Sequence, residues 1–446
     1  MNFFDKLVLP QSTEHTILLH YIAIMLQFLF LPFFSLLIAG TILSIFNRQK
    51  AGKTGDVRYL RFASELIEIT VLNKSMIIIL GLVPVVALIM LYAQLLHTMP
   101  VETVAYLLIA LIFLTCSVIA IYSYRSAFQY SNIFKDISTA DLQKAGANFS
   151  VDSISSTKKL SAQAGLWGTL LLLISTFLFI SGLYIAGQPA YWGEGVDIIS
   201  LVTSPGVILK WLQFISFSFI VTASVMLFVY FAWEKGRLKD EGEYAEFVKG
   251  KLFKVLIFSG ILQPLLIAGV FTFYSESALS NPVFLFIMIM ILAFFAAFHF
   301  FYDMYKNNNL NHTIAFLAMV LVTLYSGTIA EQLAVKNSTV KNAVLMNVVF
   351  EESVKDLEKL TASAGGLTGE EIFAQKCIAC HKYDQKVVGP AYNDVLPKYE
   401  GKMADLVEFV KNPKKVDPAF PPMPNQGLKP QEAKAVAKYI MENYKK

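Results

Sequence analysis

The sequence predicts an all-helical protein in which a polytopic bundle of eight transmembrane helices precedes a small soluble helical domain. Three observations predict this class: an apolar composition, eight long apolar runs, and a polar segment after the last run. Of the 446 residues, 55% are hydrophobic and 16% are charged, and the mean hydropathy is +0.55. This is the composition of a membrane protein. The formal net charge of +4 gives no reason to expect a nucleic-acid partner.

Eight apolar runs are long enough to cross a bilayer, which takes about 20 helical residues. The first run is too long for the apolar region of a cleavable signal peptide, so we expect it to remain as a signal anchor. We therefore predict a transmembrane domain over residues 1–333, a tether over 334–367 and a soluble domain over 368–446. The runs lie near residues 17–46, 74–97, 103–127, 163–187, 207–233, 252–275, 283–305 and 312–333.

Basic residues in the predicted loops indicate the orientation. The loops on one side carry eighteen Lys and Arg residues and the alternate loops carry none. Since cytoplasmic loops are enriched in Lys and Arg, the N-terminus and everything after the eighth span should lie outside. We predict a multi-pass protein of the bacterial inner (cytoplasmic) membrane with its soluble domain on the periplasmic side. The basic loops are 47–74, 125–162, 234–254 and 306–311, and the others are 98–102, 188–206 and 276–282.

One basic loop contains a further predicted helix. Over Val57–Thr70, Leu60, Ala63 and Ile67 recur at helical spacing among charged residues. This pattern predicts an amphipathic helix at the surface of the bundle.

The soluble segment contains the motif Cys377-Ile-Ala-Cys380-His381, which is typical of c-type haem attachment. The two thiols reach the two vinyl groups of one haem, and His381 becomes the proximal iron ligand. The alternatives are a redox cysteine pair and half of a zinc site. A zinc site needs a second ligand pair, but the only other cysteine, Cys116, lies in a distant apolar run. A thioredoxin-like pair would need a βαβ context, and none follows.

Met423 is the predicted sixth iron ligand. It lies in Phe420-Pro-Pro-Met-Pro424, where prolines stiffen the loop that presents the thioether. The rivals, Met403 and Met441, lie in or next to predicted helices over 402–411 and 430–444. We also expect Gly389-Pro390 to pack beside His381, with the Pro390 carbonyl accepting a hydrogen bond from the imidazole.

The segment from Cys377 to Val395, Cys-Ile-Ala-Cys-His-Lys-Tyr-Asp-Gln-Lys-Val-Val-Gly-Pro-Ala-Tyr-Asn-Asp-Val, resembles the class I cytochromes c of the c-551/c-552 group. The Pro-Met-Pro loop and the closing amphipathic helix, with Ala433, Val436, Ala437 and Ile440 on one face, are similar too. The resemblance covers about 80 residues. It implies one covalent low-spin haem c with an exposed edge for electron exchange.

Three stretches of the membrane part resemble the first subunit of cytochrome bd quinol oxidases. They are Leu26-Gln-Phe-Leu-Phe-Leu-Pro-Phe33, Val101-Glu102, and Leu183–Pro189 with Ser204–Gln213. The family's haem ligands in the first and fifth spans are histidines, but these positions are Gln27 and Gln213 here. The family's long quinol-handling loop is reduced to 276–282. The resemblance therefore implies an oxidase-like membrane domain without these ligands and without dioxygen reduction.

Histidines elsewhere in the membrane part leave a haem b open. His20 and His97 lie at the outer ends of the first two spans and are candidate ligands of one haem b. The alternative is that both are interfacial histidines that bond to backbone or headgroups.

Together these features predict a membrane-anchored mono-haem c-type cytochrome. As an electron-transfer subunit of a respiratory membrane complex, it would exchange electrons with a periplasmic donor or acceptor rather than act as a stand-alone catalyst. The alternative is a quinol:cytochrome c oxidoreductase with a quinone site and a haem b in the membrane domain. A redox-gated transporter or sensor is a third reading, but no inverted repeat supports it.

Overall fold

The computed structural model describes residues 11–71, 74–136, 147–193, 198–233, 236–238, 241–363 and 367–444. The chain divides into two compact units, the membrane unit (Met1–Asn347) and the C-terminal unit (Val348–Lys446). Within the described ranges all regular structure is helical, which confirms the predicted fold class.

The membrane unit contains the eight predicted spans, each long and apolar enough to cross a membrane. The second span joins three pieces, α3 (Lys74–Ile77), a π-helical turn over Ile78–Leu82 and α4 (Val83–Leu95). The fifth span continues from α9 into a π-helical turn over Phe228–Ala232. The remaining span helices are α1 (Thr13–Thr54), α5 (Thr103–Asp136), α7 (Ala147–Ala186), α9 (Pro205–Leu227), α10 (Gly242–Phe271), α11 (Asn281–Lys306) and α12 (Thr313–Ser338).

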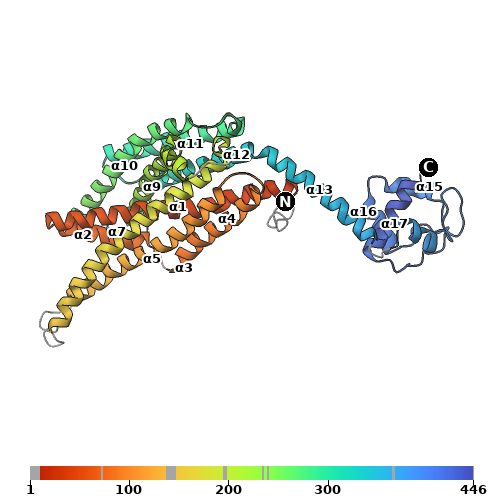
Figure 1. Cartoon of the computed structure of the whole chain (residues 1–446), viewed down its shortest axis with the longest axis horizontal. Helices are drawn as coiled ribbons and strands as arrows, with labels where there is room; N and C mark the ends of the chain where they lie inside the picture. The colour runs from red at the N-terminus through yellow and green to blue at the C-terminus, as the bar shows by residue number, and fades with distance from the viewer. Residues whose placement is uncertain are drawn as a thin grey trace. The chain divides into compact units, whose positions relative to one another are not determined.

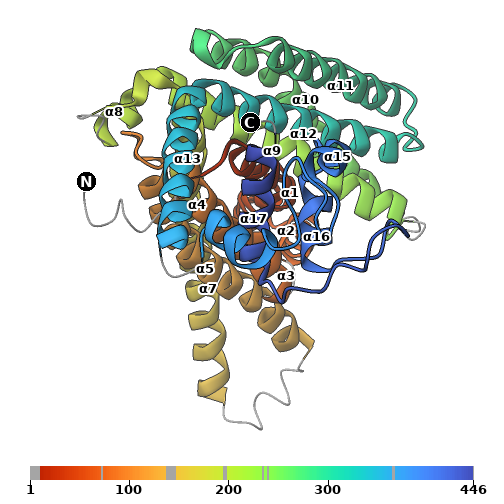
Figure 2. The ribbon, with the colours of Figure 1, turned by 90° about the vertical axis from the view of Figure 1, so that its right-hand side faces the viewer.

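Helix α1 runs through the middle of the membrane unit (Figures 1 and 2). It packs against α4, α7, α9 and α12, while α5 pairs with α7 and α11 pairs with α12. Small and hydroxyl residues let α5 approach α7 closely. Ser117 Oγ donates to Gly168 O at 2.7 Å, and Thr103 Oγ1 donates to Gly182 O at 3.0 Å. Such contacts hold helices together where the surrounding lipid is as apolar as their side chains.

Helix α2 (Val57–Thr70) has the bounds that the sequence predicts. Ala63 and Ile67 are buried against the bundle and Leu60 is half-buried. Its charged face contacts α10, where Arg58 pairs with Glu243 and Arg61 with Glu241, each at 2.6 Å. The helix therefore packs on the protein, with ion pairs fixing its register against α10.

The segment after the last span is helical. Helix α13 (Val340–Ser363) follows α12 after one residue, and its first turns attach to the membrane unit. Asn347 Oδ1 accepts from Thr13 N at 2.9 Å, and Asn342 Nδ2 donates to His97 O at 3.2 Å. The membrane unit thus extends beyond residue 333, into the predicted tether. Residues 364–366 of the predicted tether lie outside the described part of the chain.

In the C-terminal unit, a short helix before the cysteine motif crosses the last helix of the chain. Helix α14 (Gly369–Ile372) begins with a capping box between Thr368 and Glu371 and continues as a π-helical turn over Phe373–Cys377. A Cβ on Gly369 would lie 2.4 Å from Ala435 O, so the crossing with α17 (Pro430–Asn443) requires glycine. The other helices are α15 (Tyr392–Val395), a 3-10 turn over Leu396–Tyr399 and α16 (Met403–Lys411).

The core of the C-terminal unit contains the apolar stripe predicted for the last helix. Ala433, Val436, Ala437 and Ile440 are all buried and pack with side chains from the other helices of the unit. The helix begins as its sequence indicates, because Pro430 occupies its first turn and Glu432 Oε2 accepts from Lys429 N at 2.9 Å. A core this small needs further support, which a prosthetic group can supply.

Candidate functional site

The motif Cys377–His381 forms one tight turn at the end of the π-helical turn that continues α14. The amides of Cys380 and His381 both donate to Cys377 O, at 3.1 and 3.0 Å. Gly389 N donates to Cys380 O at 2.9 Å, which ties the following loop back onto the turn. The backbone therefore gathers both thiols and the imidazole on one short segment.

Burial of Cys377 bears on the alternative of a redox cysteine pair. The side chain is 5% exposed, and this burial raises the pKa of its thiol to about 11. A reactive thiol in a redox pair has a lowered pKa, because the thiolate is the nucleophile. Among the described residues, no group of three or more His, Cys, Asp or Glu side chains could hold a metal ion. Burial of its thiol disfavours Cys377 as the attacking nucleophile of a redox pair.

The imidazole of His381 is held on three sides. Its Nδ1 lies 3.0 Å from Pro390 O, and since a carbonyl can only accept, Nδ1 carries the proton. The ring stacks on Tyr392 with 5.0 Å between centroids and 18° between planes. Gly389 lies against the ring. The predicted hydrogen bond is present, and it leaves Nε2 as the nitrogen with a free lone pair.

A cavity of about 350 Å³ opens beside this imidazole. His381 and Met423 both line it, together with Tyr399, Phe409, Val416 and Ile440 from the surrounding helices and loop. Ligand sites are typically apolar and aromatic with a few placed polar groups, and this cavity has that character. Three lysines also line it, Lys398, Lys414 and Lys415.

Of the methionines in the described part of the C-terminal unit, Met423 is the one that lines the cavity. Met403 is 40% exposed on α16, and Met441 packs against the core. The loop that carries Met423 is fixed by its prolines and by Lys376 Nζ, which donates to Gln426 O at 3.1 Å. The arrangement supports the prediction that Met423 rather than its rivals faces the iron.

These residues fit a covalently attached haem. Cys377 and Cys380 lie on the turn that carries His381, and the side chains of His381 and Met423 line one cavity. Lysines suit the two carboxylates of a haem. When bound, the haem supplies one-electron redox chemistry. These residues would hold it, and the Pro390 carbonyl fixes the tautomer and orientation of the imidazole that would ligate the iron.

We expect G389A to destabilise the C-terminal unit by about 1–3 kcal/mol, the usual cost of overpacking. A Cβ at this position would lie 2.2 Å from His381 Cε1, so the imidazole or the loop must move. Thermal unfolding followed at the haem absorbance of the full chain measures the change. The neighbouring exposed residue gives the control, V388A. Equal melting temperatures for G389A and wild type would contradict the close packing.

In the membrane unit, the two candidate haem b ligands have different surroundings. His20 is buried, and its Nδ1 lies 2.8 Å from Gln332 Nε2. His97 is half-buried at the end of its span, where its carbonyl accepts from Asn342. Among the described side chains, no hydrogen bond or ring contact joins the two histidines, and haem b stays a prediction.

Gln27 and Gln213 line one small cavity of the membrane unit, although they are far apart in the sequence. An ion pair between Lys210 and Glu331 lines it as well. The sequence analysis missed Glu331 and its pairing. An acidic residue inside an apolar span is a recognisable feature, because such residues are rare in membranes and have functional roles.

The C-terminal unit is similar in sequence to a known family and to several known proteins. The family described as "Cytochrome C oxidase, cbb3-type, subunit III" matches residues 364–440. Cytochrome c-551 of Pseudomonas denitrificans is 41% identical over 78 residues, 17% of this chain and 95% of that protein. Cytochrome c-552 of Hydrogenobacter thermophilus is 37% identical over 92 residues, 18% of this chain and 93% of that protein.

Cytochrome c-551 of Pseudomonas aeruginosa is similar as well, with 38% identity over 76 residues, 16% of this chain and 73% of that protein. The chain has no significant match among solved structures. The relatives are covered over most of their length, and their identities are well above 30%, so the matches extend beyond the motif. Through its C-terminal unit the chain belongs to the family of the cytochromes c-551 and c-552, and it carries a covalent haem c that transfers electrons.

Proposed function

We propose that this protein is a membrane-anchored mono-haem cytochrome c that acts as an electron-transfer subunit of a respiratory complex in a bacterial inner membrane. The observation that carries the proposal is the cavity shared by His381 and Met423. A histidine and a methionine together fill both axial positions and raise the reduction potential, which favours electron transfer over oxygen chemistry.

The distribution of basic residues supports a periplasmic position for the haem. Eighteen Lys and Arg residues in alternate loops favour an N-terminus outside, and an even number of spans returns the chain to that side. Attachment to the membrane keeps the cytochrome at high local concentration near its partners, so weak and fast docking suffices for electron exchange. The partners would be other subunits of the complex and a periplasmic donor or acceptor.

The membrane unit, in this proposal, derives from an oxidase-like subunit that has lost its haem ligands. If the membrane unit is related to the first subunit of cytochrome bd oxidases, as its sequence suggests, Gln27 and Gln213 occupy positions where that family has histidines. Glutamine amides are not usual haem ligands, and these two line a cavity of about 50 Å³. The membrane unit would then anchor the cytochrome and dock it in the larger assembly.

The size of that cavity argues against the alternative of a quinol:cytochrome c oxidoreductase at this place. Sites for organic ligands usually enclose about 300–1,000 Å³, several times the space between Gln27 and Gln213. The cavity therefore offers no room for a quinone headgroup.

Haem stoichiometry tests the proposal. We expect a pyridine haemochrome spectrum of the purified full chain to give one haem c and no haem b. A haem b signal that disappears in H20A or H97A would overturn the mono-haem assignment and favour the quinol alternative. Purification in mild detergent, with identification of the co-purifying subunits, tests the complex. A chain that purifies without any partner, under conditions that preserve other respiratory complexes, would contradict that part.

A further inference from the structure

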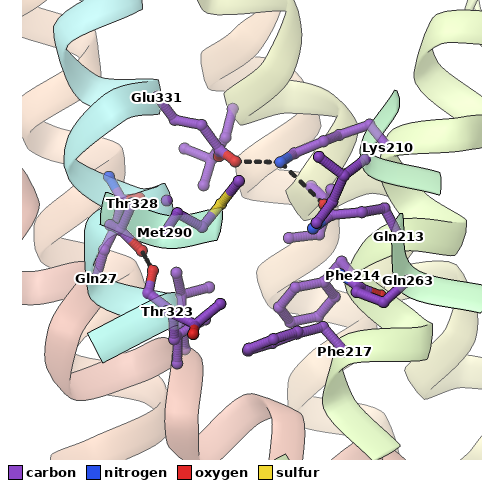
Figure 3. A pocket seen from close by; sticks show the side chains of 16 residues that line it. Gln27, Lys210, Gln213, Phe214, Phe217, Gln263, Met290, Thr323, Thr328 and Glu331 are labelled. Carbon is purple, nitrogen blue, oxygen red and sulfur yellow. Dashed lines mark hydrogen bonds and ion pairs between the residues drawn. The ribbon is translucent and has the colours of Figure 1, made fainter. Parts of the chain in front are cut away.

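A cavity with several polar side chains on its walls lies inside the membrane unit (Figure 3). Six spans meet there, namely α1, α7, α9, α10, α11 and α12. Its volume is about 50 Å³. Most walls are apolar, as expected between transmembrane helices. The polar side chains on it are Gln27, Lys210, Gln213, Gln263, Thr323 and Glu331, with Thr328 beside them.

The charged residues on the cavity form an ion pair. Lys210 Nζ contacts Glu331 Oε1 and also donates to Gln213 Oε1 at 3.2 Å, as Figure 3 shows. The lysine side chain is 10% exposed and the glutamate 33%. At 1.5 Å per residue, Lys210 lies about 8 Å from the start of α9 and Glu331 about 10 Å from the end of α12. The pair is thus one to two turns inside the bundle, where charges are costly and mark functional sites.

Gln263 gives a second and independent observation. The side chain is fully buried, and within the described part of the chain neither its Nε2 nor its Oε1 has a hydrogen-bond partner. It lines the cavity from α10, opposite the helix that carries Glu331. An amide that is buried with both polar atoms unsatisfied is unfavourable unless water fills the space beside it. Since one water needs about 10–15 Å³ on this measure, the cavity has room for a few water molecules.

On the α1 side of the cavity, a network of hydrogen bonds holds the side chain of Gln27 in place. Gln27 Nε2 donates to Gln332 Oε1 at 3.2 Å, and Tyr92 donates its hydroxyl to the same oxygen at 2.8 Å. Gln332 Nε2 in turn lies 2.8 Å from His20 Nδ1. The Gln27 amide is therefore held in place by the residue that follows Glu331 in the chain, and it keeps a polar surface on the cavity.

The charged side chains and the small volume of the cavity limit what can bind there. The ammonium of Lys210 disfavours a second cation, the carboxylate of Glu331 disfavours an anion, and the amides disfavour an apolar molecule. Water remains, and the ion that can enter with it is a proton, which Glu331 can accept. Lys210 faces Glu331 from α9, and the charge of Glu331 also acts on Tyr92 of α4, Tyr184 of α7 and Tyr274 just beyond α10.

We propose that this cavity is a hydrated proton-binding site, in which Glu331 exchanges a proton with water held by Gln263 while Lys210 compensates the carboxylate charge. One proton from bulk solvent converts the carboxylate to the acid, and the ion pair gains one positive charge. The site lies near the end of the bundle where α9 begins and α12 ends. That end is periplasmic if the proposed topology holds, but the site itself does not depend on the haem or its partner.

Infrared difference spectroscopy of the full-length protein in nanodiscs, recorded against pH, tests the proposal. Wild type should show a protonated carboxyl band that titrates and shifts in D2O, and E331Q should lack it. Replacing the lysine, in K210M, should change this band relative to wild type, because the carboxylate loses its opposite charge. Replacing the buried amide, in Q263L, should remove water-sensitive bands that respond to H2(18)O.

Two further variants keep the test decisive. The exposed loop residue Glu276 gives the matched control, since E276Q should leave the carboxyl band unchanged. The double variant K210M/E331Q removes both charges together, so it should fold at least as well as either single variant and show no titrating band. A carboxyl band that titrates identically in wild type and E331Q would overturn the proposal. So would a Q263L spectrum with the water bands of wild type.

Discussion

The double variant C377S/C380S will carry no covalent haem. Both thioether bonds require the thiols, and the remaining cysteine, Cys116, belongs to α5 of the membrane unit. We expect complete loss of haem staining at the mass of the chain on a denaturing gel. The electron-transfer signal in a reduced-minus-oxidised spectrum should be lost as well.

Two controls distinguish attachment from folding of the membrane unit. C116S should retain full haem staining, since this exposed side chain is remote in the sequence from the motif. C377S/C380S should still insert into membranes at wild-type levels, because the membrane unit has its own core. Haem that stays bound to the double variant through denaturation would show that the motif is not the attachment site.

Replacing Met423 by alanine should lower the reduction potential and open the sixth coordination position. Methionine opposite histidine raises the potential, and axial ligands together span a range of about 0.8 V. We expect M423A to fall in potential by a substantial part of that range. It should also bind carbon monoxide in the reduced state, which wild type should not. Redox titration and absorbance spectra of the full chain measure both effects.

The other methionines of the C-terminal unit are matched controls for this experiment. M403A changes an exposed residue and M441A a residue packed on the core, and neither lines the cavity. Both should keep the wild-type potential and stay closed to carbon monoxide, although M441A should melt at a lower temperature. If M441A or M403A bound carbon monoxide and M423A did not, the methionine replaced in that variant, and not Met423, would be the sixth ligand.

Much of the architecture could be predicted from local sequence patterns. Eight apolar runs correspond to eight spans because a single helix must satisfy its own backbone hydrogen bonds in lipid, whatever its neighbours are. The bounds of the helix over Val57–Thr70 followed from its 3.6-residue periodicity, and in the structure Asp56 caps its first turn. The hydrogen bond from His381 to Pro390 was predictable because both residues lie within one short loop.

The features that escaped prediction all depend on residues that are distant in the sequence. The end of the membrane unit at Asn347 depends on contacts of α13 with Thr13 and His97, at the other end of the chain. The pairing of Lys210 with Glu331 joins α9 to α12. Helix order in the chain does not say which faces of two spans meet, so apolar periodicity could not reveal these contacts.

By itself, the sequence determined the covalent chemistry of this protein and the number of its spans. The Cys-x-x-Cys-His motif and the apolar runs are local, and their physical requirements are met within a few residues of the chain. Only the tertiary structure brought His381 and Met423 to one cavity and left Met403 and Met441 outside it. It likewise brought Gln27, Gln213 and the unsatisfied Gln263 together around an ion pair, because burial and hydrogen-bond partners are properties of packed helices and not of any one of them.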